Sequence, residues 1–160
     1  MFRLRPASAA DLPFLRALAD ERRLAEWQGR GIEPGLLAPL LAQQFQAQQA
    51  GWRQAHPSSV DQIIECGEPV GRLWTDRADA ACWTVVDIGL LGAWRGQGLG
   101  SRVLQALQAE ARAAGAALTL HVANDNPAQR LYGRLGFEWV ADQPPHRQLC
   151  WLPPPCNERP

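Results

Sequence analysis

The turn at residues 95–101 is the stretch whose residue types and spacing point most directly to chemistry. Gly96, Gly98 and Gly100 stand at alternate positions, so no side chain there keeps a ligand away from the backbone. The turn joins an apolar strand to a helix, whose first turn leaves about four N–H groups unpaired and carries the positive end of the helix dipole. The turn therefore predicts a diphosphate site built from main-chain N–H groups. The alternative is a plain turn without a ligand, because alternate glycines also occur there.

Two familiar nucleotide-binding motifs do not fit this turn. The Rossmann fingerprint requires Gly-x-Gly-x-x-Gly, and Ser101 stands where its third glycine would fall. A P-loop requires lysine before Ser or Thr, and the chain contains no lysine. The turn instead follows the pattern Arg/Gln-x-x-Gly-x-Gly/Ala.

A second motif lies at residues 122–137. It contains Asn126-Pro127-Ala128, then Leu-Tyr at 131–132 and Leu-Gly-Phe at 135–137. In order and separation, the two motifs resemble those of the GNAT superfamily of acyl-CoA-dependent N-acyltransferases. With the opening Leu-Arg-Pro-Ala and Ala-Asp-Leu segments, the resemblance covers about residues 2–152.

The resemblance implies an α/β (α+β) fold and a donor substrate. We expect a central mixed, mostly antiparallel sheet of roughly six or seven strands, flanked by about four helices. Two of its strands should splay apart to form the slot for coenzyme A. The co-substrate would be acetyl-CoA, with no metal. The residues expected on the coenzyme are Leu90, Leu91, Arg95, Gly96, Gln97, Gly98, Leu99, Gly100, Ser101, Asn126 and Tyr132.

Tyr132 is the only tyrosine in the chain. The resemblance implies that it protonates the departing thiolate, because a phenol with a pKa of about 10 is protonated at neutral pH. The alternative is an aromatic side chain packed at helical spacing with Leu131 and Leu135. Asn126 would bind the pantetheine arm or its ordered water, or cap the helix before Pro127, and one asparagine can do both.

Asp87 is the candidate base on the strand before the turn. It could accept the proton of the attacking amine directly or through water, orient a cationic substrate, or make a structural hydrogen bond at a strand kink. The resemblance also implies a bulge at residues 89–91, with the Leu90 amide polarising the acetyl carbonyl. Arg95 and Arg102 are either supplementary charges for the diphosphate or solvated residues of the helix face.

The histidines and tryptophans give weaker signals. A strand position between Leu120 and Val122 favours a satisfied structural role for His121, whereas His56 and His146 stand in loops without an identifiable partner. Packing is the default role of each tryptophan, but one of four could line the acceptor site: Trp27, Trp52, Trp74 or Trp94.

Hydrophobic periodicity and turn residues place the elements that position these side chains. The expected strands are at 2–5, 60–66, 70–75, 83–91, 117–122, 137–140 and 147–152. The expected helices run from 8–11 to about 24, from 36 to 50, from the turn to Gly115, and from Pro127 to Gly136.

Composition limits the classes of partner. The 160 residues suit one domain at 1–152, followed by a Pro-rich tail at 153–160. Basic and acidic residues balance at 16 each, so no strong field recruits nucleic acid or a membrane surface. No apolar run approaches the roughly 20 residues of a membrane span. We therefore expect no nucleic-acid or membrane partner and a cytoplasmic location.

The four cysteines are Cys66, Cys82, Cys150 and Cys156. They form no Cys-x-x-Cys pair, so neither a zinc site nor a disulfide framework is expected. Reduced thiols are the default, and the first three stand in apparent strands.

The resemblance implies direct transfer of an acetyl group from acetyl-CoA to a primary amine in a ternary complex. The acceptor would be a small-molecule amine or a peptide. Glu26 and Glu33 are too few acids for a polyamine site, which leaves an aminoglycoside, an amino acid and a peptide terminus open. The alternative is a non-catalytic acyl-CoA sensor or partner module on the same fold. The chain would be a monomer or a homodimer.

Overall fold

The computed structural model describes residues 1–155, in which seven strands form one sheet in the order β1-β2-β3-β4-β5-β7-β6. Every neighbouring pair is antiparallel except β4 and β5, which are parallel. The predicted mixed, mostly antiparallel sheet is therefore confirmed. The strands are β1 (Arg3–Pro6), β2 (Val60–Glu65), β3 (Pro69–Asp76), β4 (Cys82–Leu90), β5 (Ala117–Ala123), β6 (Glu138–Gln143) and β7 (His146–Trp151).

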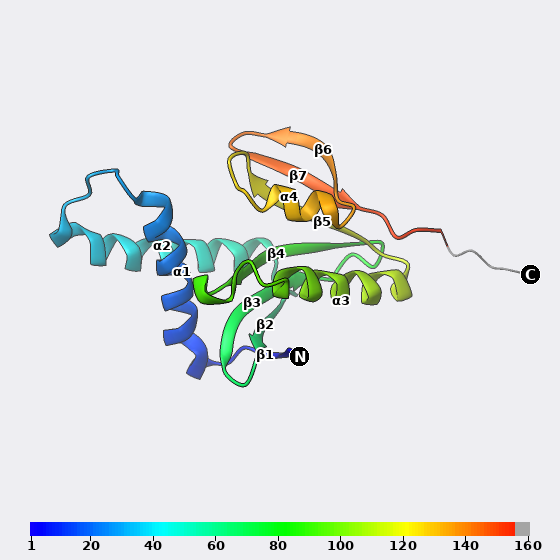
Figure 1. Cartoon of the computed structure of the whole chain (residues 1–160), viewed down its shortest axis with the longest axis horizontal. Helices are drawn as coiled ribbons and strands as arrows, with labels where there is room; N and C mark the ends of the chain where they lie inside the picture. The colour runs from blue at the N-terminus through cyan, green and yellow to red at the C-terminus, as the bar shows by residue number, and fades with distance from the viewer. Residues whose placement is uncertain (156–160) are drawn as a thin grey trace, which may run out of the picture.

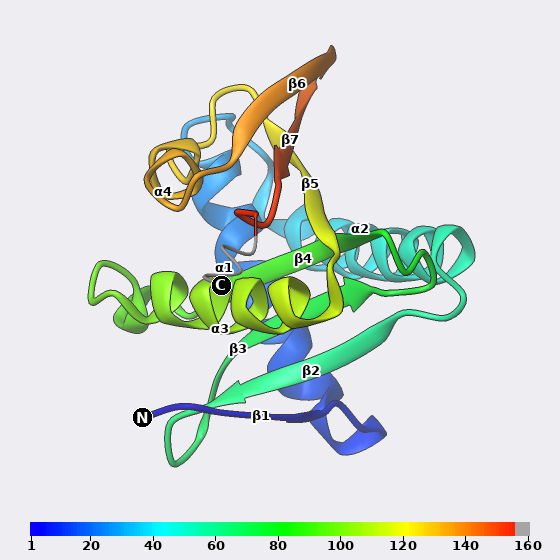
Figure 2. The ribbon, with the colours of Figure 1, turned by 90° about the vertical axis from the view of Figure 1, so that its right-hand side faces the viewer.

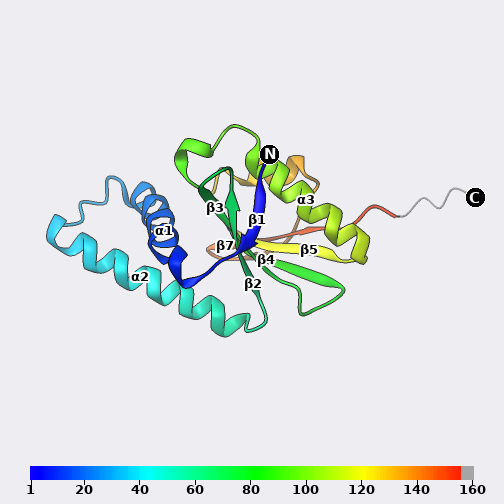
Figure 3. The same cartoon turned by 90° about the horizontal axis from the view of Figure 1, so that it is seen from below.

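Helices cover both faces of this sheet. They are α1 (Leu12–Trp27), α2 (Pro34–Ala55), α3 (Leu99–Ala114) and α4 (Gln129–Arg134), with short 3₁₀ turns η1 (Ala9–Asp11) and η2 (Gly92–Trp94). Figure 3 shows α1 and α2 on one side of the strands and α3 on the other. The overall arrangement is seen in Figure 1. The predicted tail and Cys156 lie partly or wholly outside the described residues.

Three helices differ from their predicted bounds. α1 ends at Trp27 rather than at about Leu24. α2 is longer than the predicted 36–50, because it begins at Pro34 and ends at Ala55. α4 begins at Gln129 rather than near Pro127. The reason is a turn before α4, in which Asn126 Oδ1 accepts a hydrogen bond from the Ala128 N–H at 2.9 Å.

The main core lies between the sheet and the two helices α3 and α4. Five residues of α3 are fully buried there at helical spacing, namely Leu99, Val103, Leu104, Leu107 and Ala111. They pack in one cluster with Leu118 of β5 and Tyr132 of α4. A smaller cluster of Leu15, Phe45 and Ile63 joins α1 and α2 to the other face. Both faces of the sheet are therefore held by apolar burial, the main stabilising term in folding.

β4 and β5 are paired over only part of their length. The ladder runs from Cys82 opposite Ala117 to Val85 opposite Leu120 and ends there, although β4 continues to Leu90. Figure 2 shows β5, β7 and β6 turning away from β4 beyond this point. The predicted separation of the central strand from the one after it is confirmed.

A bulge in β4 lies at Val86. Val85 pairs with Thr75 and Asp87 with Trp74, so Val86 is the extra residue. The bulge reverses the side-chain alternation, which puts Asp87 on the face of α1 and α2 while Val85 and Ile88 pack in the core of α3. The prediction of a bulge at residues 89–91 is wrong, because Leu90 still pairs with Gly71. The sequence does not reveal this reversal, because β4 has apolar residues on both faces and so lacks an apolar–polar alternation.

Candidate active site

The turn at 95–101 connects η2 to α3 and exposes backbone at the start of the helix. Gly96 and Gly98 have φ values of 71° and 80°, which other residues rarely adopt. A Cβ atom at either position would meet no other atom within 4 Å. The turn therefore presents main chain to open space directly beside the unpaired N–H groups of α3, as a backbone anion site requires.

Side chains from within the turn and from α1 hold this loop. Gln97 Nε2 donates to the Ala93 carbonyl at 2.8 Å, and Arg95 Nε donates to the Leu90 carbonyl at 3.0 Å. Arg95 also contacts Glu21 Oε1 at 3.3 Å. Arg95 is therefore engaged by the loop and α1, whereas Arg102 is exposed on the first turn of α3.

The Leu90 amide faces the edge of β4 that β5 has left. The N–H of Leu91 donates to Val70 of β3 at 2.9 Å. Because N–H groups alternate along a strand, those of Leu90 and Ile88 point the opposite way. Two backbone donors of β4 thus lie along the separation of β4 from β5, and the predicted role of the Leu90 amide on the acetyl carbonyl stays a prediction.

Two adjacent residues of α1 hold the end of β4. Arg22 Nη1 contacts Asp87 Oδ1 at 3.0 Å, and its Nη2 donates to the Ile88 carbonyl at 3.3 Å. Glu21 Oε1 accepts the Gly92 N–H at 2.6 Å. A Cβ on Gly89 would overlap the Arg22 guanidinium, so this glycine makes room for the ion pair. Sequence reasoning missed both α1 residues, since nothing in the sequence links them to β4.

Tyr132 of α4 is part of the main core cluster. Its side chain is 7% exposed, and its ring packs edge-on against Phe137 with centroids 5.8 Å apart. Burial, helped by the negative charge of Asp87, raises the pKa of Tyr132 to about 12, and the charge of Arg22 opposes the rise. The charges of Asp87 and Arg22 therefore act on Tyr132, whereas the side chain it is seen to pack against is Phe137.

Asn126 is exposed in the turn before α4. Its Oδ1 is taken by the Ala128 N–H, which fits the capping alternative. The side-chain nitrogen of Asn126 takes no part in this contact. The predicted contact of Asn126 with the coenzyme stays a prediction.

A cavity of about 420 Å³ opens on the α2 side of the sheet where β4 and β5 part. All three histidines of the chain contribute to its wall. It is lined by Gln48, Trp52, His56, Thr84, Val85, Val86, His121, Gln143 and His146.

The cavity changes what the sequence suggested for these residues. His121 is exposed on β5, so the prediction of a satisfied structural histidine is wrong, because alternation turns it away from the buried Leu120 and Val122. His56 does have a partner, since its Nδ1 lies 2.7 Å from Asp76 Oδ2. Of the four tryptophans considered, Trp52 lines the cavity, braced edge-on by Trp74 at 5.6 Å.

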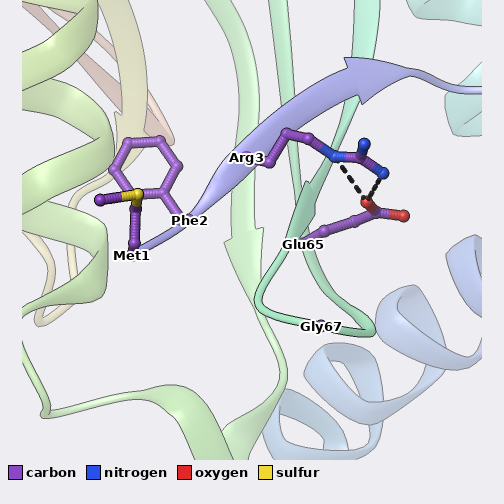
Figure 4. A pocket seen from close by; sticks show the side chains of 5 residues that line it. All are labelled: Met1, Phe2, Arg3, Glu65 and Gly67. Carbon is purple, nitrogen blue, oxygen red and sulfur yellow. Dashed lines mark hydrogen bonds and ion pairs between the residues drawn. The ribbon is translucent and has the colours of Figure 1, made fainter.

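A second hollow of about 280 Å³ lies at the opposite edge of the sheet, beside β1. Figure 4 shows its lining residues, Met1, Phe2, Arg3, Glu65 and Gly67, with the ion pair of Arg3 and Glu65. β2 and β3 separate it from β4. It contains none of the predicted site residues.

Residues 1–155 hold no group of three or more His, Cys, Asp or Glu residues placed to bind a metal. None of the helices in this part of the chain has the length and apolarity to cross a membrane. Cys66, Cys82 and Cys150 are unpaired thiols, and Cys66 stands in the turn after β2 rather than in a strand.

Comparison with known proteins identifies the family. The sequence profile of the acetyltransferase (GNAT) family matches residues 22–137, which span β4, the glycine turn, α3, β5 and α4. This chain therefore belongs to the GNAT acetyltransferase family. No curated protein matches it.

Solved structures share the fold. The PaiA N-acetyltransferase of Thermoplasma acidophilum, crystallised with coenzyme A, superposes with a TM-score of 0.73 at 12% identity over 95% of this chain and 99% of its own. An acetyltransferase of Thermus thermophilus gives 0.66 at 22% identity, over 95% and 97%. YncA of Salmonella typhimurium, solved with acetyl-CoA, gives 0.59 at 20% identity, over 95% and 94%. At these identities the likeness establishes the fold.

Proposed function

We propose that this protein transfers an acetyl group from acetyl-CoA to the primary amine of an acceptor by direct attack in a ternary complex. The observation that carries the proposal is the open edge of β4. It leads to the glycine turn, whose main chain faces open space. It also carries Asp87, which is paired with Arg22 and whose charge acts on Tyr132.

The residues present fit coenzyme A. The N–H groups of the turn at 95–101 and of the start of α3 would hold the diphosphate, with Arg102 as a nearby charge. The N–H groups of Leu90 and Ile88 are available to the amides of the pantetheine arm and to the thioester carbonyl, which a backbone donor polarises. When bound, the thioester supplies an activated acyl group.

Tyr132 would act as the general acid. The amine nitrogen forms a bond to the acetyl carbon, the carbon–sulfur bond breaks, and the Tyr132 hydroxyl donates its proton to the sulfur. A pKa of about 12 keeps that hydroxyl protonated at neutral pH. Packing against Phe137 fixes the ring, so the packing and catalytic roles of Tyr132 are compatible.

Asp87 would receive the proton of the amine. Arg22 contacts its Oδ1, which leaves Oδ2 to accept the proton directly or through a water molecule. The Arg22 contact also fixes the carboxylate at the bulge, so the structural hydrogen bond and the base are two functions of one side chain. The ion pair lies on the acceptor's side of the sheet, the face that also carries the cavity.

The experiment is an assay of thiol release from acetyl-CoA over a panel of amines, run beside a measurement of coenzyme A binding. Amine-dependent thiol release supports the proposal. Tight binding of coenzyme A with no thiol release for any amine class would favour the alternative of an acyl-CoA sensor or partner module.

A further inference from the structure

We infer that the acceptor is a small amine that also carries a carboxylate, as an amino acid does, and that this carboxylate binds in the histidine-lined cavity. The inference rests on the proposed function, because it names the acceptor class of the same site. It chooses among the acceptor classes that the sequence leaves open.

The wall of the cavity is rich in hydrogen-bond donors and contains no ionised acid. Three imidazoles, two carboxamides and one hydroxyl line it, and no Asp, Glu or Arg is among the lining residues. Each of these groups can donate a hydrogen bond to a carboxylate. A polyamine or an aminoglycoside carries several ammonium groups, which need carboxylates as partners.

Two carboxylates next to residues of the cavity wall, Asp76 and Asp87, already have partners. Asp76 accepts from the Ala78 N–H at 2.9 Å and lies 2.7 Å from His56, and both contacts lower the pKa of its carboxyl group. Asp87 is paired with Arg22, and the charge of Glu26 also acts on that guanidinium. A second ammonium group of the acceptor would therefore have to displace an existing cation or donor.

His121 and His146 are placed to bind one carboxylate together. His121 pairs with Gln148 and His146 with Ala123, so the two histidines occupy diagonal positions on one face of the β5–β7 ladder. Diagonal neighbours in such a ladder are about 7–8 Å apart, a span that one carboxylate bridges with an oxygen toward each ring. Both histidines are exposed in the absence of a ligand.

The same cavity borders the reacting centre. Val85 and Val86 line it, and the next residue, Asp87, faces the same side of the sheet. Leu120, which pairs with Val85, is followed by His121. An acceptor can therefore place its amine at the edge of β4 near Asp87 and its carboxylate over the histidines of the same cavity. The volume of about 420 Å³ is near the lower end of ligand pockets, which suits a molecule of amino-acid size. Trp52 offers an apolar wall for its side chain.

The test compares amines that differ only in the carboxylate. The twenty L-amino acids and their α-carboxamides are assayed as acceptors with acetyl-CoA, beside spermidine and kanamycin. Binding of the same compounds to the coenzyme A-saturated protein is measured by calorimetry. Three variants are compared with the wild type: His121→Ala, His121→Glu, and Gln105→Glu, which makes the same charge change on the exposed face of α3.

We expect the wild type to prefer at least one amino acid over its carboxamide by about tenfold or more, the effect of one charge-assisted hydrogen bond. His121→Ala, which removes the donor, should raise the KM of that amino acid with kcat and coenzyme A affinity unchanged. His121→Glu should reverse the preference toward the carboxamide, and Gln105→Glu should leave it unchanged. Because His121 is exposed, these substitutions leave the core intact.

The outcomes separate the two proposals. Turnover of spermidine, kanamycin or the carboxamides as readily as of the amino acids overturns the inference and supports the proposed function. Preferential binding of an amino acid without turnover supports the inference and contradicts the proposed function. If no amino acid is bound or turned over, the inference is overturned. An equal loss of activity with the amino acid and with its carboxamide in His121→Glu also overturns it.

Discussion

The guanidinium of Arg22 on α1 lies 3.0 Å from the carboxylate of Asp87 on β4 and crosses the strand over Gly89. This ion pair ties the first helix to the strand edge where we place the chemistry. It connects three features that lie far apart in the sequence: a helix near the N-terminus, a bulge at Val86 and a glycine without room for a side chain. The account predicts consequences for each.

Replacing Gly89 by alanine should displace Arg22 from Asp87, because the added methyl group overlaps the guanidinium. Because the guanidinium is the far end of a flexible side chain, we expect it to move aside with little change in the free energy of unfolding and with a fall in kcat, measured by urea denaturation and the thiol-release assay. Gly51→Ala on α2 is the matched control, since a Cβ there meets no atom within 4 Å and should stabilise the helix. A wild-type kcat in Gly89→Ala would show that the position of Arg22 does not depend on this glycine.

Asp87→Asn should lower kcat by about 100-fold, the low end of what a positioned base contributes. It should also destabilise the fold, because Arg22 loses its partner. The control is Asp20→Asn, which removes a carboxylate paired with an arginine at the same 3.0 Å distance on α1 but away from β4. A kcat loss no greater in Asp87→Asn than in Asp20→Asn would assign proton removal to solvent.

Tyr132→Phe should lower kcat by about 100-fold and leave coenzyme A affinity nearly unchanged, since only the proton donor is lost. The pH dependence has a definite sign. A pKa raised from 10 to about 12 keeps the acid form populated at higher pH, so the ratio of wild-type to variant kcat should stay constant from about pH 7 to pH 10. A decrease of this kcat ratio before pH 10 is reached would remove Tyr132 from the mechanism. Unchanged turnover in Tyr132→Phe would do the same.

Gly98→Ala should weaken coenzyme A binding and destabilise the fold by about 1 kcal/mol, because φ is 80° at this position. Gly115→Ala imposes similar strain, with φ of 70°, at the other end of α3. It should lower the melting temperature similarly without affecting coenzyme A affinity. Equal affinities in the two variants, measured by calorimetry, would argue against a diphosphate site at the turn.

Much of the fold could be predicted from the sequence, because its signals are local. The alternate glycines at 96, 98 and 100, the apolar strand before them and the helical spacing of Val103, Leu104 and Leu107 each follow from backbone sterics and burial. The sheet and the separation of β4 from β5 were predicted from the resemblance to the GNAT superfamily that the two motifs carry.

The acceptor side could not be predicted, because its residues meet only in three dimensions. Arg22 reaches Asp87 across 65 positions of the chain, and His56, His121 and His146 come from three separate segments. The bulge at Val86 decides which face of the sheet Asp87 occupies. An apolar run with side chains on both faces does not show where such a bulge lies. These placements depend on tertiary packing, which a single sequence does not display.

The most direct measurement follows an isotopically labelled acetyl group from acetyl-CoA in the presence of the best acceptor found, by mass spectrometry of the small molecules. The account predicts that the label appears on the acceptor amine in an amount equal to the thiol released, and that no labelled protein accumulates. Bound acetyl-CoA that keeps its label while an acceptor is also bound would contradict it.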